Sequence, residues 1–149
     1  IEGIKEIPKQ LFHPFQLRIE SEEYQDVGEY LLFMVTNSQS VGGYKQAAPL
    51  ASISDGALDV ILLKKVEITQ VTDLIIKILQ GDHINHPAVT YFQTKHVKIF
   101  PEDDSHISID YDGEYYGELP ADISILEGKI DVIIPQTENK NETEQHENK

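Results

Sequence analysis

The residue best placed for chemistry is an acid that directly follows a tight turn. Residues 107–119 read ISIDYDGEYYGEL, and an Asp-Gly pair between two alternating segments is typical of a two-residue hairpin loop. Such a loop would pair Tyr111 with Glu114. Both would then lie on the face that carries Ile107 and Ile109. A carboxylate at the rim of an apolar surface binds a proton more readily than one in water, which suits a general base. Glu114 is therefore a candidate catalytic base, although the residues alone favour a non-catalytic role. A structural turn, or a longer loop with another register, is the alternative.

A second Asp-Gly turn gathers oxygen atoms of the kind that magnesium prefers. In ASISDGALDV, residues 51–60, a hydroxyl at Ser52, a carboxylate at Asp55 and a carbonyl at Ala57 fall within six residues. One tight turn could aim these three oxygens at one point, with water filling the remaining octahedral positions. The spacing makes these residues candidates for a magnesium site, but Asp-Gly turns are common, and from spacing alone a purely structural turn is the better interpretation.

Other patterns for catalysis are weak or absent. His83 and His86 in GDHINHP are spaced to bind one metal ion, but no third ligand lies in a fitting pattern, so we expect both on the surface. The chain has no G-x-S-x-G, no Walker-type loop and no G-x-G-x-x-G. The pair Gly42-Gly43 is not followed by a helix start that could hold a phosphate. If this protein uses a nucleotide, another segment binds it.

Composition excludes several classes of protein. The 149 residues carry 26 acidic and 12 basic side chains, a formal net charge of −14, which disfavours nucleic acid and broad anionic lipid surfaces as partners. The absence of cysteine excludes disulfides and thiolate metal sites. No apolar run approaches the roughly 20 residues that span a bilayer, and the amino terminus has no signal pattern. We expect a cytoplasmic protein whose membrane contact is peripheral.

The apolar pattern predicts mostly strands. Residues 13–21 and 23–37 alternate and should form a hairpin around 21–23, with Gly28 as a bulge. A further strand is expected over 58–63. From residue 89 onward, strands are expected in VTYFQTKHVKIF, HISIDY, EYYGEL, DISIL and KIDVII.

One segment, residues 69–81, has strong helical spacing, with Thr69 as the expected N-cap and Gly81 as the terminator. Many short strands and one helix predict a mainly β fold: a two-sheet β-sandwich, distorted and barrel-like, with the amphipathic helix packed on it. We expect one domain over 1–135 and a disordered polar tail over 136–149. The start at Ile1, within an apparent helical turn, suggests a piece of a longer chain.

Taken together, three segments resemble the carboxy-terminal domain of the bacterial diacylglycerol kinase and lipid kinase family, relatives of sphingosine kinases. They are TNSQSVGGYKQAAPLASISDGALDVILLKK, LQGDHINHPAVTYFQTKHVKI and IDYDGEYYGELP. The order and spacing of a Gly-Gly loop, an Asp-Gly-x-Leu turn and an Asp-Gly-Glu turn are more specific than any single piece. The resemblance covers about 130 of the 149 residues, and HINHPAVTYFQTK looks closest to the diacylglycerol kinases of Gram-positive bacteria.

The resemblance implies roles for both turns. Glu114 matches the glutamate that is the family's proposed base, which deprotonates the lipid hydroxyl. Ser52, Asp55 and the carbonyl of Ala57 match a magnesium site that the family is thought to use structurally. The fold that the resemblance implies, a two-sheet β-sandwich with a helix, agrees with the apolar pattern.

The resemblance also implies partners. A kinase of this family would phosphorylate diacylglycerol to phosphatidic acid, and ATP would be bound mainly by an amino-terminal α/β domain with a Gly-Gly-Asp-Gly-Thr motif, which this chain lacks. We therefore expect the chain alone to be inactive. Its expected partners are Mg²⁺, a lipid such as diacylglycerol, its own nucleotide-binding domain, a membrane surface and a second copy in a homodimer, but not nucleic acid. Sphingosine-like bases and phosphatidylglycerol are alternative substrates.

Two other functions are compatible with the sequence. The same sandwich could be a metal-stabilised module that binds a lipid or a partner without catalysis, with the Glu114 turn purely structural. A β-sandwich hydrolase would need a second acid roughly 5 to 9 Å from Glu114. Asp112 is too close in sequence to be convincing, and Glu118 qualifies only if the predicted hairpin pairing holds.

Overall fold

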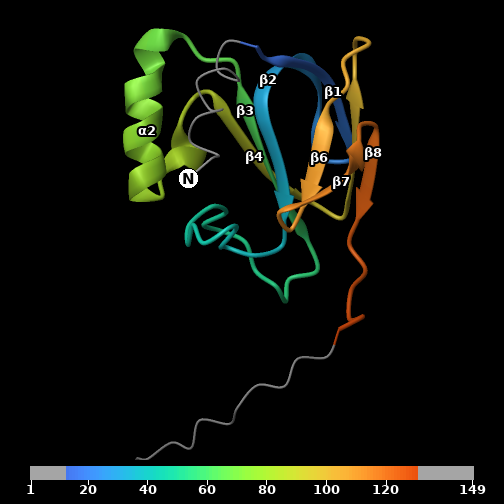
Figure 1. Ribbon diagram of the computed structural model, residues 1–149. Coiled ribbons are helices and arrows are strands. Elements are labelled where there is room, and N and C mark those ends of the chain that lie inside the picture. The colour runs from blue at the N-terminus through green and yellow to red at the C-terminus, as the bar shows by residue number, and fades with distance from the viewer. Residues whose placement is uncertain (1–12, 131–149) are drawn as a thin grey trace, which may run out of the picture.

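The computed structural model describes residues 13–130, in which eight strands and one α-helix are present (Figure 1). The predicted strand KIDVII, the helical turn at the amino terminus and the tail over 136–149 lie wholly or largely outside these residues. In chain order the elements are β1 Phe15–Ser21, β2 Gln25–Thr36, β3 Leu58–Lys64, the 3-10 turn η1 Ile68–Gln70, α2 Val71–Gln80, the 3-10 turn η2 His83–Asn85, β4 Val89–Thr94, β5 His96–Pro101, β6 Ser108–Tyr111, β7 Glu114–Glu118 and β8 Ala121–Ser124.

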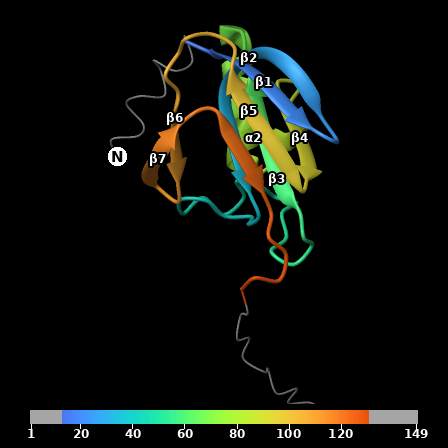
Figure 2. The same ribbon diagram turned by 90° about the vertical axis from the view of Figure 1, so that its right-hand side faces the viewer.

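Six of the strands form one antiparallel sheet in the order β4-β3-β2-β1-β5-β8, and β6 and β7 form a separate hairpin. The hairpin covers one face of the sheet, whereas α2 lies on the opposite side (Figures 1 and 2). This arrangement confirms the predicted mainly β, sandwich-like fold with one packed helix. Within the described part of the chain the large sheet stays open between β4 and β8, so no closed barrel forms.

The main core lies between the large sheet and the hairpin. Alternating side chains from β1, β2, β3 and β5 point to this face, as strand geometry requires. Ile107 and Leu119, at the two ends of the hairpin segment, complete the core from the other side. The buried residues of this cluster are Leu17, Ile19, Tyr30, Val60, Leu62, Val97, Ile99, Ile107 and Leu119.

The opposite face of the sheet is covered by α2 and by the loop over residues 37–57. Leu74 of α2 packs with Leu31 of β2, and Ala48 and Ala51 of the loop pack on Ile61 of β3. As a result, β3 has five consecutive buried residues, from Leu58 to Leu62. A strand covered on both faces is expected to show consecutive buried residues, and here four are aliphatic and one is the acid Asp59.

The helix begins differently from the prediction and ends as predicted. Thr69 is not the N-cap: α2 begins at Val71 with Gln70 at its N-cap position, and no side chain caps it there. Instead, Glu67 and Gln70 form a capping box around η1, which satisfies backbone groups one turn earlier. Gly81 ends the helix in the left-handed conformation, with φ of 71°.

The predicted bulge at Gly28 is wrong. Gly28 pairs regularly with Leu17 of β1, and the irregularity lies between Tyr30 and Leu32, on the side facing β3. The extra residue allows Tyr30 and Phe33, three positions apart, to contact the same main core. Strict alternation would have sent them to opposite faces.

A carboxylate links β2 to β3 near the surface. Asp26 Oδ2 accepts hydrogen bonds from the Tyr24 hydroxyl at 2.9 Å, from the Tyr30 hydroxyl at 2.8 Å and from Lys64 Nζ at 2.6 Å. The Lys64 ammonium and the two hydroxyls lower the pKa of Asp26 from 3.8 to about 2. Burial, together with the contacts to Tyr24 and Asp26, raises the pKa of Tyr30 well above its usual range.

Asp26→Asn should lower the free energy of unfolding at pH 7 by about 1–2 kcal/mol. Because the folded-state pKa of Asp26 is about 2, below the usual 3.8, its contribution is complete above pH 4 and is lost as the pH falls towards 2. Urea unfolding of both proteins between pH 2 and pH 7 measures this difference. Asp104→Asn, at an exposed loop position, is the control. Equal stability of wild type and Asp26→Asn at pH 7 would contradict the assignment.

Candidate functional site

The β6–β7 hairpin has the tight loop that the sequence predicts. Asp112 and Gly113 both have positive φ, 51° and 86°, as a type I′ turn requires at its two central positions. Tyr111 pairs with Glu114, so the predicted two-residue loop and register are confirmed at the tip. Further along, the register shifts, because Asp110 pairs with Tyr115 whereas Ile109 pairs with Gly117. This shift explains why EYYGEL does not alternate.

The hairpin extends beyond the core, and Glu114 is exposed there. Ile107 is buried and Ile109 is half-buried, whereas Tyr111 and Glu114 are exposed. The expected partial withdrawal of Glu114 from water is therefore wrong for this chain on its own, because no other described segment covers the tip. The predicted role of Glu114 as a base is a separate matter and stays a prediction.

The hairpin that carries Glu114 also carries three exposed tyrosines. Tyr111, Tyr115 and Tyr116 are 67%, 68% and 76% exposed. The rings of Tyr111 and Tyr116 are tilted by 47° with centroids 6.0 Å apart. Exposed tyrosines in one place offer an apolar surface with a polar edge, a combination that suits contact with lipid or with another protein.

Glu118, the second acid considered for hydrolysis, is occupied elsewhere. Its Oε2 lies 2.8 Å from Nδ1 of His106, and this carboxylate raises the pKa of His106. Glu118 pairs with Ser108, whereas Glu114 pairs with Tyr111, so the two acids lie at opposite ends of β7. The arrangement does not favour a two-carboxylate hydrolase.

The structure places the three predicted metal ligands in one loop that leads into β3. The backbone N–H of Ala57 donates to Asp55 Oδ1 at 3.0 Å, which closes the turn. Ser52 Oγ lies 3.2 Å from Ser54 Oγ. Asp55 is exposed, and Ser52 and Ala57 are half-buried. The loop therefore presents a hydroxyl, a carboxylate and a carbonyl near the surface.

These three oxygens suit a magnesium ion that keeps several of its waters, and not one enclosed entirely by protein ligands. Within residues 13–130, no group of three or more His, Asp or Glu side chains could hold a metal ion by itself. Magnesium usually keeps several waters and uses only one or two carboxylates, so Ser52, Asp55 and Ala57 would suffice. A metal bound here would supply positive charge between the loop and whatever covers it.

A second carboxylate, which the sequence reading missed, lies beside the loop. Asp59 is completely buried on β3, at 0% exposure. Its Oδ1 accepts hydrogen bonds from the Tyr91 hydroxyl and from Gln93 Nε2, the latter at 3.2 Å. Gln93 Nε2 also donates to Asp55 Oδ2 at 3.0 Å, so one amide joins both acids. An acid inside the buried run LDVILL was the available signal.

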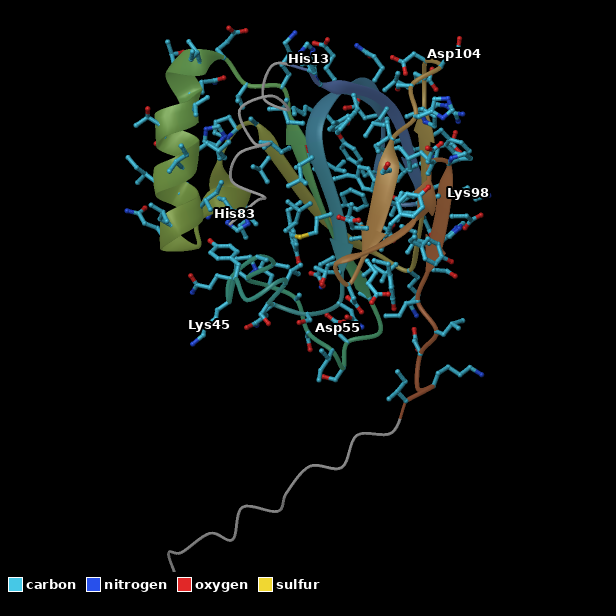
Figure 3. The ribbon with its side chains drawn as sticks, in the orientation of Figure 1. His13, Lys45, Asp55, His83, Lys98 and Asp104 are labelled. Atoms are coloured by element: carbon cyan, nitrogen blue, oxygen red, sulfur yellow. The ribbon has the colours of Figure 1, made fainter. Side chains whose placement is uncertain are left out.

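The two candidate turns lie at the same end of the molecule. Figures 1 and 2 show the end of β6 and the start of β7 at the edge where β2 passes into the 37–57 loop. In Figure 3, Asp55 lies at this end and Asp104 at the other. Beside Ser52 there is a shallow open depression of about 480 Å³, lined by Ser38, Gln39, Ser40, Lys45, Ala51, Ser52 and Ile53.

The two loop histidines are structural, and their predicted exposure is wrong. His83 and His86 are only 6% and 3% exposed. His83 Nε2 lies 2.9 Å from the carbonyl oxygen of Ala47, and His86 Nδ1 accepts the N–H of Ala88 at 3.1 Å. They connect η2 to the 37–57 loop and to the start of β4. Periodicity gave no signal for this burial, because it depends on the fold of the loop.

Comparisons with known proteins agree on one family. A model described as the YegS C-terminal NAD kinase beta sandwich-like domain matches residues 3–134. Proteins named diacylglycerol kinase from Bacillus subtilis (strain 168) and Staphylococcus aureus (strain JH9) are each 32% identical to this chain. Each alignment covers 91% of the chain, with 44% and 42% of the respective relative. The chain thus spans less than half of these relatives.

A solved structure has the same fold. A diacylglycerol kinase from Bacillus anthracis str. Sterne superposes with a TM-score of 0.64 at 25% identity, covering 84% of this chain and 46% of that one. Across residues 13–130, no helix has the length and apolar character needed to cross a membrane.

Gly113→Ala should destabilise the protein by about 1 kcal/mol, because alanine is strained at a φ of 86° even though no atom lies within 4 Å of its added Cβ. Gly113→Asn should cost less, since asparagine tolerates positive φ. Chemical denaturation of both variants measures the difference. Equal losses for alanine and asparagine would mean that the tip does not hold this conformation.

Proposed function

We propose, since the chain belongs to the family of YegS C-terminal NAD kinase beta sandwich-like domains, that it is the lipid-side domain of an ATP-dependent kinase for diacylglycerol. The observation that carries the proposal is the match over residues 3–134, together with relatives that are named diacylglycerol kinase. The chain covers only 44% of the first relative. ATP and its magnesium would be bound mainly by the remaining part of such a kinase, so the chain alone would be inactive.

Glu114 would act as the general base. When the lipid hydroxyl attacks the γ-phosphate of ATP, a new P–O bond forms and the bond to ADP breaks, and Glu114 takes the hydroxyl proton. A base must come within hydrogen-bonding distance of the proton it removes, and an exposed acid at a hairpin tip can do so. Phosphoryl transfer then depends mostly on positioning and electrostatic support.

The exposed tyrosines would receive the lipid. Tyr111, Tyr115 and Tyr116 are the large exposed side chains of the hairpin that carries Glu114. Tyrosine is well suited to the boundary between apolar chains and a polar head group. Diacylglycerol resides in a bilayer, so the proposal includes peripheral membrane contact from the cytoplasm. A homodimer stays a prediction.

Mg²⁺ would be held at Ser52, Asp55 and the carbonyl of Ala57. The support is the donor chemistry of the loop and the fact that, within residues 13–130, no ion pair neutralises Asp55. The ion would stiffen this loop at the end of the molecule where the Glu114 turn also lies. Its role would thus be structural and distinct from that of the magnesium bound with ATP.

Glu114→Gln in the kinase that contains this domain should lower kcat roughly 100-fold or more, because the lipid hydroxyl loses its proton acceptor. Phosphorylation of diacylglycerol with labelled ATP measures this, and sphingosine-like bases and phosphatidylglycerol serve as competing substrates. Glu118→Gln is the matched control on the same strand and should leave kcat near the wild-type value. Near-normal turnover by Glu114→Gln with intact lipid binding would instead favour a binding module.

Asp55→Asn should weaken Mg²⁺ binding and so reduce the rise in Tm that Mg²⁺ gives the wild-type chain. The Tm values in EDTA and in millimolar Mg²⁺ measure this difference. A wild-type Tm that does not depend on Mg²⁺ would refute the metal site, whatever the outcome for Glu114.

A further inference from the structure

We infer that Asp59 is a second carboxylate of the cation site at the 52–57 turn, to which it offers its Oδ2 oxygen. This inference rests on the proposed magnesium site. Oδ2 is buried and has no hydrogen-bond partner, although Oδ1 of the same carboxylate has two. A buried carboxylate oxygen without a partner is costly, and native proteins almost always satisfy such atoms.

The position of Asp59 in the sheet directs this carboxylate toward the loop. Asp59 lies two residues before Ile61 on β3, so the two side chains share one face of the strand. Ile61 packs against Ala48 and Ala51 of the 37–57 loop. Gln93, opposite Asp59 on β4, reaches Asp55 in the turn with the same nitrogen that it gives to Asp59. Asp59 therefore lies on the side of the sheet where the metal loop folds over.

Neither acid is paired with a cation in the described part of the chain, although Glu127, which pairs with Lys95, lies beside Gly56 of the same turn. Asp55 and Asp59 share a single amide donor, and no Lys, Arg or His in residues 13–130 forms an ion pair with either. The Tyr91 hydroxyl and the Gln93 amide are neutral donors and contribute no positive charge. Two close carboxylates, one of them fully buried, repel one another unless a cation lies between them.

A divalent cation is the ligand that this environment favours. Two carboxylates, a hydroxyl and a backbone carbonyl form an all-oxygen donor set of the kind bound by Mg²⁺ or Ca²⁺. Asp59 would give the ion its main buried charge, while Ser52, Asp55 and Ala57 would hold it from the surface side. The Gln93 amide, which donates to both acids, would partly offset their repulsion when no ion is bound.

Asp59→Asn separates this role from a purely structural one. Asparagine keeps an oxygen for the Tyr91 hydroxyl and removes the charge. If Asp59 binds the cation, the variant should be at least as stable as wild type in EDTA, because an unbalanced buried charge has gone, while its affinity for Mg²⁺ falls tenfold or more. If Asp59 only accepts hydrogen bonds, Asp59→Asn should lose the same amount of stability with and without Mg²⁺.

The experiment uses the 149-residue chain, with thermal unfolding in EDTA and across a Mg²⁺ titration. A Tb³⁺ titration followed by tyrosine-sensitised emission gives a second measure of affinity. Asp55→Asn is the reference for loss of the site, and Asp104→Asn, at the other end of the molecule in Figure 3, is the control that should bind as wild type does. Circular dichroism verifies folding.

Gln93→Leu provides an independent test if Asp59→Asn does not fold. Gln93 is exposed, so the substitution leaves the core and both carboxylates in place. Without the shared donor, the chain should be less stable in EDTA and should gain more from Mg²⁺ than wild type does. An equal loss in both conditions would overturn the inference.

The outcomes separate the two claims. Loss of Mg²⁺ binding in Asp55→Asn but wild-type affinity in Asp59→Asn would overturn this inference and leave the metal site standing. A wild-type chain whose Tm and Tb³⁺ emission do not respond to cations would overturn both.

Discussion

Strand β3 lies between two apolar layers, and the positions of both candidate turns depend on how each layer is covered. Val60 and Leu62 face the main core, which Ile107 and Leu119 close from the hairpin side. Ile61 faces the other way, where the 37–57 loop covers it. Burial of these aliphatic side chains contributes about 1.5–3 kcal/mol each, far more than the exposed ion pairs of the surface. The packing of one strand thus holds the 37–57 loop on one face of the sheet and the Glu114 hairpin on the other.

The protein withdraws two carboxylates from water in different ways. Oδ2 of Asp26 has three donors, one of them the Lys64 ammonium, so the charge of this carboxylate is balanced and its pKa falls to about 2. Asp59 is more deeply buried, yet its donors are neutral and one of its oxygens has none. Because burial makes an unbalanced charge more costly, the deeper carboxylate should be the better compensated of the two. The more deeply buried acid is instead the less compensated one, and this is the physical reason to place a cation beside Asp59.

Local patterns in the sequence predicted the features whose causes are local. The Asp112-Gly113 turn, the Gly81 terminator and the buried run of β3 follow from backbone preference and hydrophobic periodicity. Burial of the two loop histidines did not, because it results from contact with a segment 36 residues away, as between His83 and Ala47. The position of the bulge next to Leu31 was not predicted for a similar reason. It depends on which of the two cores the side chains of β2 contact. Asp59 is visible in the sequence as an acid within a buried strand. Its link to Asp55 through Gln93, however, depends on the pairing of β3 with β4.

The sequence predicted that Glu114 is partly withdrawn from water, but in the proposed kinase the reaction requires this side chain to be exposed. A base enclosed by its own domain could not reach a hydroxyl carried by a lipid, whereas a base on a loose loop could not hold the geometry of transfer. The hairpin meets both conditions, because its ends are fixed while its tip is free. Ile107 and Leu119 are buried in the main core, and the N–H of Leu119 donates to the carbonyl of Ile107 at 2.9 Å. Exclusion of water, which strengthens electrostatic support for the transferred phosphoryl group, would then come from the lipid, the tyrosines and the nucleotide-binding part of the enzyme as they close over the tip.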